Sequence, residues 1–351
     1  MNSEVRRVQK FGRSTLMVSL PADWVKVVGL KAGDPVSIEL NEDGSLRVLP
    51  LSIASKKVEK VVKLVINKLS DEELITRSIY ATYLLGYDKV IIESVDGYLM
   101  DTQFKSIRKI AKTLIGVEIV EQLPDKLVLQ VFVDPSKYSV SGLLNRMGNI
   151  LRYMIQYFIL GIINKQTHLL EEVRELEVEL DRLYALTVRQ LLLSQLDRSL
   201  AKVLGIKVSL ITEFRTIAKA LEDSGDSIDS ATQALLEGGT EVLEKLTQIT
   251  DILRESLDTL TLIIDRTMRS LGESNLLTIN ETINLINEFF KHVEKYSIML
   301  FRKLGLDETY LVIRELLDKL TLVAKNFETI SEIAYDMAIE KQRAEINLAV
   351  K

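Results

Sequence analysis

The spacing of hydrophobic and polar positions changes once along the chain, close to residue 138. Before that point, short runs rich in apolar and β-branched residues, such as LMVSL, PVSIEL, SLRVLP, KVIIES and KLVLQVFV, predict β-strands. After it, apolar residues recur every three or four positions, as in amphipathic helices. All five prolines lie at or before Pro135, which supports the division because proline breaks helix interiors. We therefore expect a mixed N-terminal part followed by a long all-helical part.

Residues 1–50 are predicted to form a strand, a short helix and a hairpin. The helix is expected to begin at Pro21 and to end at Gly29. The hairpin is expected to turn at Glu42-Asp43-Gly44. So short a segment, with three or four strands, buries too little apolar surface to be stable alone. It is therefore expected to dimerise or to pack on the rest of the chain.

Residues 51–138 are predicted to alternate strands and helices in the order βαβαββ. The two helices are expected in SDEELITRSIYATYLLGY and TQFKSIRKIAKTLIG, and the last two strands flank Pro124. This order predicts a small α/β sandwich with the helices on one face of the sheet. No glycine-rich phosphate loop follows the strands, so the segment lacks a nucleotide-binding fingerprint.

Residues 139–351 are predicted to form about six helices, with Gly238-Gly239 among the separators. A weak repeat aligns IAKALEDSGD (217–226) with VAKNFETISE (323–332) without gaps. The offset of 106 residues, from Ile217 to Val323, is about half of this segment. Two stacked three-helix units would give such an offset, with halves of about residues 139–238 and 239–351.

Composition narrows the class of protein. The chain contains no cysteine, which excludes disulfides, thiolate metal sites and cysteine nucleophiles. The most apolar stretch, residues 153–163, is too short for the ~20 residues of a membrane span and is expected to be a buried core helix. The N-terminus lacks the apolar core of a secretory signal. These features predict a cytoplasmic protein without a membrane span.

Several carboxylates fall on the apolar side of a predicted helix in ALEDSGDSID (220–229). At ~100° per residue, Glu222, Asp226 and Asp229 lie within about 60° of one another and border the apolar stripe. Asp223 points away and is expected to face water. Gly225 lies on the inner face, where it is expected to let another backbone or a ligand come close.

The same four-residue spacing recurs on two other predicted helices, at Glu177/Asp181 and at Glu328/Glu332. Carboxylates one turn apart can share a cation, whereas crowded like charges without one are unfavourable. Oxygen-only ligands favour hard cations such as Mg²⁺, Mn²⁺ or iron. The alternative is that these are ordinary exposed acids, neutralised by a neighbour such as Lys219.

Cations and hydroxyls gather near the N-terminus, at Arg6, Arg7, Lys10, Arg13, Ser14 and Thr15. Such residues suit contacts to a phosphate backbone, with arginine able to read base edges. A solvated basic surface is the alternative interpretation.

The stretch KFGRSTLMVSLPADWVKVVGLKAGDPVSIELNEDGSLRVLP resembles the AbrB/SpoVT (MazE-like) swapped-hairpin module. The family's K-x-G-x-x-T, Pro and G-[IL]-K-x-G-D pattern is matched at Lys10, Gly12, Thr15, Pro21, Gly29, Leu30, Lys31, Gly33 and Asp34. The resemblance implies that two chains interleave into one small barrel whose basic residues face DNA. In the helix after its proline the family often has arginine, where this chain offers Lys26.

LEDSGDSI resembles the E-R-x-G-D-x-x signature of PhoU proteins, the phosphate-uptake regulators. These proteins have two three-helix bundles with E/DxxxD motifs that bind iron, zinc or magnesium. The resemblance implies that the ligands are Glu177, Asp181, Glu222 and Asp226, with Glu328 and Glu332 in the second half. On the fifth helix this chain has no ExxxD pair. The combination of modules is similar to the PhoU-like regulators of archaea.

These observations predict a multidomain α+β protein. It would have an N-terminal swapped-hairpin β-barrel (1–50), a small α/β domain (51–138) and a C-terminal all-α pair of three-helix bundles (139–351). The expected function is that of a homodimeric, DNA-binding regulator of phosphate uptake. Its helical part would bind divalent or trivalent metal ions, either Fe, Zn, Mg or Mn.

Two alternatives stay open. In the first, the helices contact a phosphate transporter or a signalling protein, and the barrel only dimerises. In the second, the acids serve a metal-dependent phosphoesterase, which is less favoured because no general base stands apart from the ligand acids. The chain lacks HExxH, GxSxG and GxxxxGK[ST], so we expect no enzymatic activity.

Overall fold

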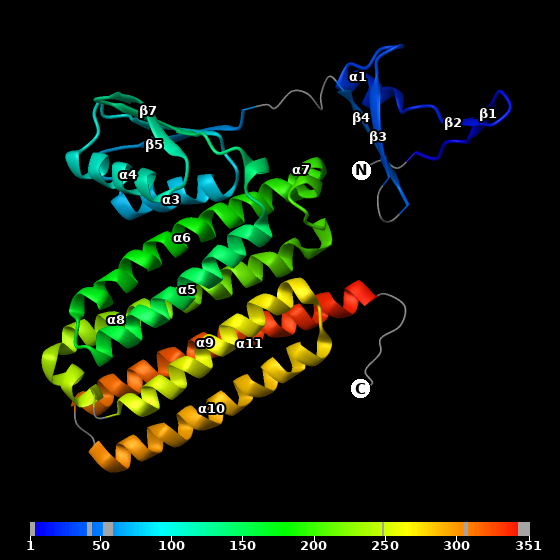
Figure 1. Ribbon diagram of the computed structural model, residues 1–351. Helices are drawn as coiled ribbons and strands as arrows, with labels where there is room; N and C mark the ends of the chain where they lie inside the picture. The colour runs from blue at the N-terminus through cyan, green and yellow to red at the C-terminus, as the bar shows by residue number, and fades with distance from the viewer. Residues whose placement is uncertain (1–3, 41–43, 52–58, 248, 305–307, 343–351) are drawn as a thin grey trace. The chain divides into compact units, whose positions relative to one another are not determined.

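The computed structural model describes residues 4–40, 44–51, 59–247, 249–304 and 308–342 (Figure 1). It divides into two units, Met1–Glu59 and Lys60–Lys351. In the first unit, β1 (Gln9–Phe11) pairs with β2 (Thr15–Met17), α1 spans Ala22–Val28, and β3 (Val36–Leu40) pairs antiparallel with β4 (Leu46–Pro50). The predicted helix and hairpin are confirmed. Of the predicted turn, Glu42 and Asp43 lie outside the described residues.

The first unit has almost no core within one chain. Among its described residues only Pro50 is buried. Phe11, Leu16 and Ile38 remain 64%, 70% and 61% exposed. Exposed apolar side chains at this density favour association, since covering them removes unfavourable contact with water. The expected pairing with a second chain stays a prediction with this physical basis.

The second unit begins with an α/β region that has the predicted βαβαββ order. Its elements are β5 (Val61–Ile66), α3 (Glu72–Leu84), β6 (Lys89–Ser94), α4 (Asp101–Thr113), β7 (Val117–Leu123) and β8 (Lys126–Val131). The sheet order is β5-β6-β8-β7, with only β5 and β6 parallel. Both helices cover one face, as predicted (Figure 1). Ile79, Ile92, Ile107, Leu127 and Leu129 form the core between them.

The rest of the unit is helical, as expected. The long helices are α5 (Val140–Ile163), α6 (Thr167–Leu196), α8 (Ile211–Thr247), α9 (Thr250–Glu273), α10 (Leu276–Leu304) and α11 (Glu308–Gln342), and α7 (Arg198–Val203) is short. Helices α5, α6 and α8 form one bundle and α9, α10 and α11 a second, with α8 beside α11 (Figure 1). Helix α8 is interrupted at Gly239, whose φ of 67° is non-helical. The interruption falls where the two predicted halves meet.

The 106-residue offset relates the two bundles helix by helix. It carries Ile217 on α8 to Val323 on α11. The same shift brings α5 and α6 to within four residues of α9 and α10, and it lays the first part of α8 on α11, which begins nine residues earlier. The bundles are therefore two versions of one three-helix unit.

The apolar stretch at residues 153–163 lies in α5 and contributes to the bundle core, as predicted. Met154, Ile155, Phe158 and Ile162 are each at most 2% exposed. Within the described ranges, no helix combines the length and the apolar character that crossing a membrane requires.

A buried arginine joins the α/β region to the first bundle. Arg189 on α6 is 2% exposed, and its Nη1 donates hydrogen bonds to the carbonyl oxygens of Tyr83 (2.7 Å) and Tyr87 (2.9 Å). Its guanidinium also lies over the Tyr83 ring, 5.0 Å from the centroid. These carbonyls lie at and just beyond the last turn of α3, so Arg189 completes that helix end from another element.

Replacing Arg189 with methionine should destabilise the protein by about 2 kcal/mol. The variant keeps the length of the side chain but removes its hydrogen bonds to the Tyr83 and Tyr87 carbonyls and its ion pair with Asp88 (3.8 Å). Urea unfolding would measure the difference. The matched control is Arg77→Met on α3, which breaks an exposed pair with Glu73 (2.6 Å) and should cost less than about 0.5 kcal/mol. Equal unfolding midpoints for the two variants would contradict the role of Arg189.

Candidate metal centre

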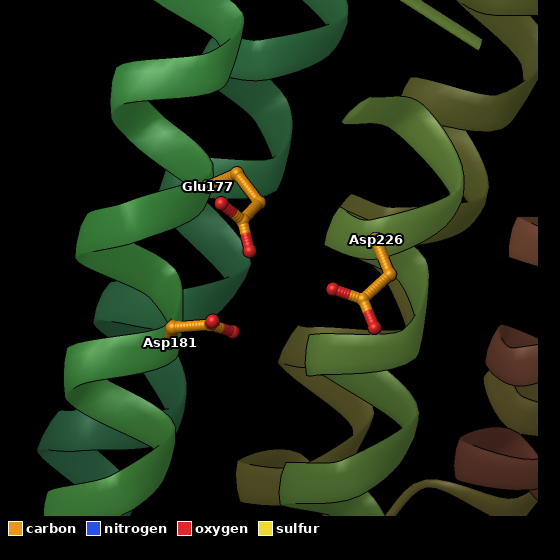
Figure 2. A group of neighbouring side chains, drawn as sticks. All are labelled: Glu177, Asp181 and Asp226. Carbon is orange, nitrogen blue, oxygen red and sulfur yellow. The ribbon is translucent and has the colours of Figure 1, made fainter. Parts of the chain in front are cut away.

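Three carboxylates from two helices converge in the first bundle. Glu177 and Asp181 project from α6, and Asp226 projects towards them from α8 (Figure 2). One oxygen from each lies within 4.8 Å of the others. Glu222, Asp223 and Asp226 form a second such group along α8. Among the described residues, these two triplets are the groups of at least three acidic, histidine or cysteine side chains that lie close enough to hold a metal ion. We call the five residues the carboxylate cluster.

The packing of α6 against α8 determines how closely the acids of the two helices approach each other. Leu180, between the two acids of α6, is fully buried. A Cβ added to Gly225 would lie 2.2 Å from Leu180 Cδ2, so a side chain there would displace Leu180. The close approach predicted for Gly225 is therefore made by a leucine of the neighbouring helix. It brings Asp226 opposite Glu177 and Asp181.

Burial and like charge disfavour ionisation across the carboxylate cluster. Burial, reinforced by Asp181, raises the pKa of Glu177 to about 8. Burial also raises the pKa of Glu222 to about 7, although Lys219 opposes the shift. The pKa values of Asp181 and Asp226 are raised by burial as well, even though solvent reaches both side chains. The cluster therefore favours a proton or a metal cation between its carboxylates.

Lys219 neutralises one end of the carboxylate cluster. Its Nζ pairs with Glu222 and, at 2.8 Å, with Asp223, and it lies 5.7 Å from the centroid of the Tyr184 ring. Asp223, expected to face water, has a side chain that is 44% exposed, and it also pairs with Lys219. One lysine cannot balance five acids, so the end at Glu177, Asp181 and Asp226 keeps the uncompensated charge.

Asp229 lies outside both groups. Its carboxylate accepts from Arg174 Nε at 3.3 Å, and this ion pair is a sufficient reason for an acid at that position. The structure thus brings five acids within metal-sharing distance, while Asp229 joins neither group although its charge still acts on Glu177, Asp181 and Asp226.

The second bundle has a lysine that corresponds to Lys219, but it lacks the excess of carboxylates found in the first bundle. Lys325 pairs with Glu328 and lies 5.9 Å from the Phe290 ring centroid. The 106-residue offset maps these three residues onto Lys219, Glu222 and Tyr184. It also maps Glu177 and Asp181 onto Ile283 and Asn287, which cannot supply carboxylates. Glu328 and Glu332 accordingly join no group of three acids among the described residues.

Two tyrosines border the carboxylate cluster. Helical spacing alone places Tyr184 on the face of Glu177 and Asp181, one turn after Asp181, whereas sequence analysis missed Tyr80. Tyr80 comes from α3, where its phenol is influenced by Tyr184, Asp181 and Glu222. Burial is the main reason that the pKa of each phenol is raised. No local pattern could have found Tyr80, because it belongs to a different segment.

The predicted DNA-contacting residues are all exposed in the first unit. Lys10 lies in β1, Arg13 and Ser14 in the β1–β2 turn, and Thr15 at the start of β2. Arg6 and Arg7 precede this hairpin, and Lys26 lies on α1. Gly12 in the turn has a φ of 66°, which favours glycine. Arg6 pairs with Glu4.

The metal-free protein should lose stability as the pH rises. The folded-state pKa of Glu177 is about 8, above its ordinary value of 4.5, so the folded chain holds a proton that the unfolded chain releases. This stabilisation is complete below about pH 4.5 and is lost as the pH rises through about 8. Because solvent screens part of the cluster, we expect a loss of about 1–2 kcal/mol.

Urea unfolding in chelator at about pH 5 and about pH 9 would measure this loss. Glu177→Gln removes the titrating group and should flatten the pH dependence. Glu118→Gln, an exposed acid on β7, is the control and should leave it unchanged. A Glu177→Gln variant with the pH dependence of the native chain would contradict the assignment.

Comparison with known proteins bears on both units. Residues 9–56 match the family model "Antidote-toxin recognition MazE, bacterial antitoxin", and residues 144–235 match the PhoU domain. A solved structure, PhoU from Pseudomonas aeruginosa, is 12% identical with a TM-score of 0.45, covering 57% of this chain and 96% of that chain. The search of curated proteins returned no match. The archaeal part of the resemblance stays a prediction. The chain therefore contains a PhoU domain within its helical part and a MazE-like segment near its N-terminus.

Proposed function

We propose that this protein is a DNA-binding regulator of phosphate uptake whose first helical bundle binds one metal ion. One observation carries the proposal: the residues that match the PhoU domain, 144–235, contain every member of the carboxylate cluster. The MazE-like match at residues 9–56 supplies a module of a DNA-binding type, with its basic hairpin exposed. The proposal includes no catalytic step. Contact with DNA would place the protein in the cytoplasm.

The donor set fits a hard cation. The carboxylate oxygens of Glu177, Asp181 and Asp226 come close enough to share one ion. Oxygen ligands suit Mg²⁺, Mn²⁺ or iron better than zinc, which prefers nitrogen and sulfur. A bound cation would replace protons, relieve the repulsion between α6 and α8, and hold the two helices together.

The charge balance supports one metal ion per chain. In the first bundle, five carboxylates face one lysine, Lys219. In the second, Lys325 faces Glu328 and Glu332, and the positions matching the α6 acids carry Ile283 and Asn287. The second bundle thus keeps the lysine pairing and lacks the charge excess that would attract a metal ion.

Calorimetric titration of the metal-free protein with Mn²⁺ should show one site per chain. Asp226→Asn should weaken that site at least about tenfold, because it removes the cluster carboxylate that faces Glu177 and Asp181 from α8. The matched control is Glu332→Gln on α11, which should leave affinity and stoichiometry unchanged. Two sites per chain, or equal weakening by both variants, would contradict the assignment.

The basic hairpin of the first unit is the proposed DNA contact. Lys10 and Arg13 lie on a short hairpin where both side chains can reach phosphates. Each phosphate neutralised by lysine or arginine releases a counterion, so affinity falls as salt rises. A dimer would present two copies of the hairpin to the duplex, which would strengthen binding without new chemistry.

The full-length protein should bind a duplex that it has itself selected from a random-sequence pool. Fluorescence anisotropy at increasing KCl should show a smaller salt slope for Lys10→Gln/Arg13→Gln, by about 0.9 for each phosphate that is no longer neutralised. The control Lys112→Gln, an exposed lysine on α4, should keep the native slope. If the protein selects no duplex, or if the double variant and the native chain show equal salt slopes, the alternative in which the first unit only dimerises is favoured. The same assay with and without Mn²⁺ tests whether the helical part regulates binding.

A further inference from the structure

Helix α3 of the α/β region lies along α6 in a register that two contacts define. Arg189 donates a hydrogen bond to the Tyr83 carbonyl, and a Cβ added to Gly86 would lie 2.6 Å from Leu193 Cδ2. Residue numbers rise together on the two helices, so α3 and α6 run side by side in the same direction. One turn before Arg189, Ala185 is 1% exposed and belongs to the core of the α/β region. We call Ala185, Arg189 and Leu193 the α3-binding stripe.

The α3-binding stripe continues directly into the carboxylate cluster. Asp181 precedes Ala185 by one turn of α6 and lies about 40° from it around the helix axis. On α3, Tyr80 precedes Tyr83 by about one turn and therefore lies at this level. Long side chains on a helix lean towards its N-terminus, which directs the half-buried phenol of Tyr80 towards the level of Asp181. The charges of Asp181 and Glu222 act on this phenol, as its position requires.

The hydroxyl group of Tyr80 is a donor that the rest of α3 does not use. The neighbouring Tyr83 donates its own hydroxyl to the Ile115 carbonyl at 2.9 Å. Among the described residues, no acceptor takes the hydroxyl of Tyr80. A phenol is a strong donor to an ionised carboxylate and a weaker one to a neutral carboxyl group. The state of the carboxylate cluster therefore decides how strongly it can hold Tyr80.

The second bundle lacks the acids and the α/β region together. The 106-residue offset maps the α3-binding stripe onto Lys291, Lys295 and Met299 of α10. All three are exposed, and the described elements packed extensively against α10 are α9 and α11 of its own bundle. The same helix has Ile283 and Asn287 where α6 has its two acids. Within this chain, the helix that supplies the acids is thus also the helix that holds the α/β region.

We propose that Tyr80 completes the metal centre from the α/β region by donating a hydrogen bond to the carboxylate of Asp181. The inference rests on the proposed metal site, and Tyr80 is a positioning residue that contacts a ligand acid. When the site is filled, Asp181 holds no proton, so its carboxylate accepts a stronger hydrogen bond from the phenol. Metal binding and the contact between α3 and α6 then strengthen each other by the same factor.

Calorimetric titration with Mn²⁺ tests the role of Tyr80 in the full-length protein. Tyr80→Phe keeps the ring, removes the hydroxyl and should weaken Mn²⁺ binding about tenfold. The matched control is Tyr83→Phe, which removes a hydroxyl from the same helix and loses its bond to Ile115. This control should leave Mn²⁺ affinity unchanged. Equal affinities for the native chain and Tyr80→Phe, or equal weakening by both variants, would overturn the proposal.

Hydrogen exchange of the backbone amides tests the link to the α/β region. In the native chain, Mn²⁺ should slow the exchange of α3 by up to about tenfold, because metal binding strengthens its contact with α6. In Tyr80→Phe this slowing should be lost. The amides of α10, which carries no ligand acids, are the internal control and should exchange at the same rate with and without Mn²⁺. Slowing of α3 that persists in Tyr80→Phe would also overturn the proposal.

The two experiments separate this inference from the proposed function. A native chain that binds no Mn²⁺ contradicts the proposed metal site and this inference with it. A native chain that binds one Mn²⁺ ion, with Tyr80→Phe equal to it in affinity and in α3 exchange, contradicts this inference alone.

Discussion

The repulsion among carboxylates held between α6 and α8 is the constraint on which the first bundle depends. Leu180 packs against Gly225 and holds the helices close, so Glu177, Asp181 and Asp226 meet between α6 and α8. Apolar packing thus imposes an unfavourable electrostatic arrangement. Lys219 relieves it at one end only, and the other end is where the bundle has most to gain from a cation.

Helix α6 connects this charged site to the α/β region. Asp181 and Arg189 lie eight residues apart, about 12 Å along a helix. Asp181 belongs to the carboxylate cluster, and Arg189 donates a hydrogen bond to the Tyr83 carbonyl in the last turn of α3. The phenol of Tyr80, also on α3, is influenced by Asp181 and Glu222 of the cluster. A shift of α6 at the cluster would therefore act on α3 and on the α/β region that contains it.

The two bundles show how one three-helix unit has been used in two ways. Lys219 and Lys325 each pair with a glutamate and lie over an aromatic ring. In this shared contact the lysine and the glutamate balance each other's charge. The described part of the second bundle places no group of three acids beside the contact. The acids of α6 are what distinguish the first bundle.

Much of the architecture could be predicted from residue patterns, because they act locally. Period-two runs and prolines located the strands, period-three-to-four runs located the helices, and four-residue spacing placed Glu177 above Asp181. Such spacing specifies a direction on one helix and says nothing about the helix that will lie opposite. Only tertiary packing decided that Asp226 joins the α6 acids, that Asp229 pairs with Arg174, and that Tyr80 borders the cluster. The physical reason is that residues tens of positions apart meet through the packing of whole apolar faces, which no local pattern records.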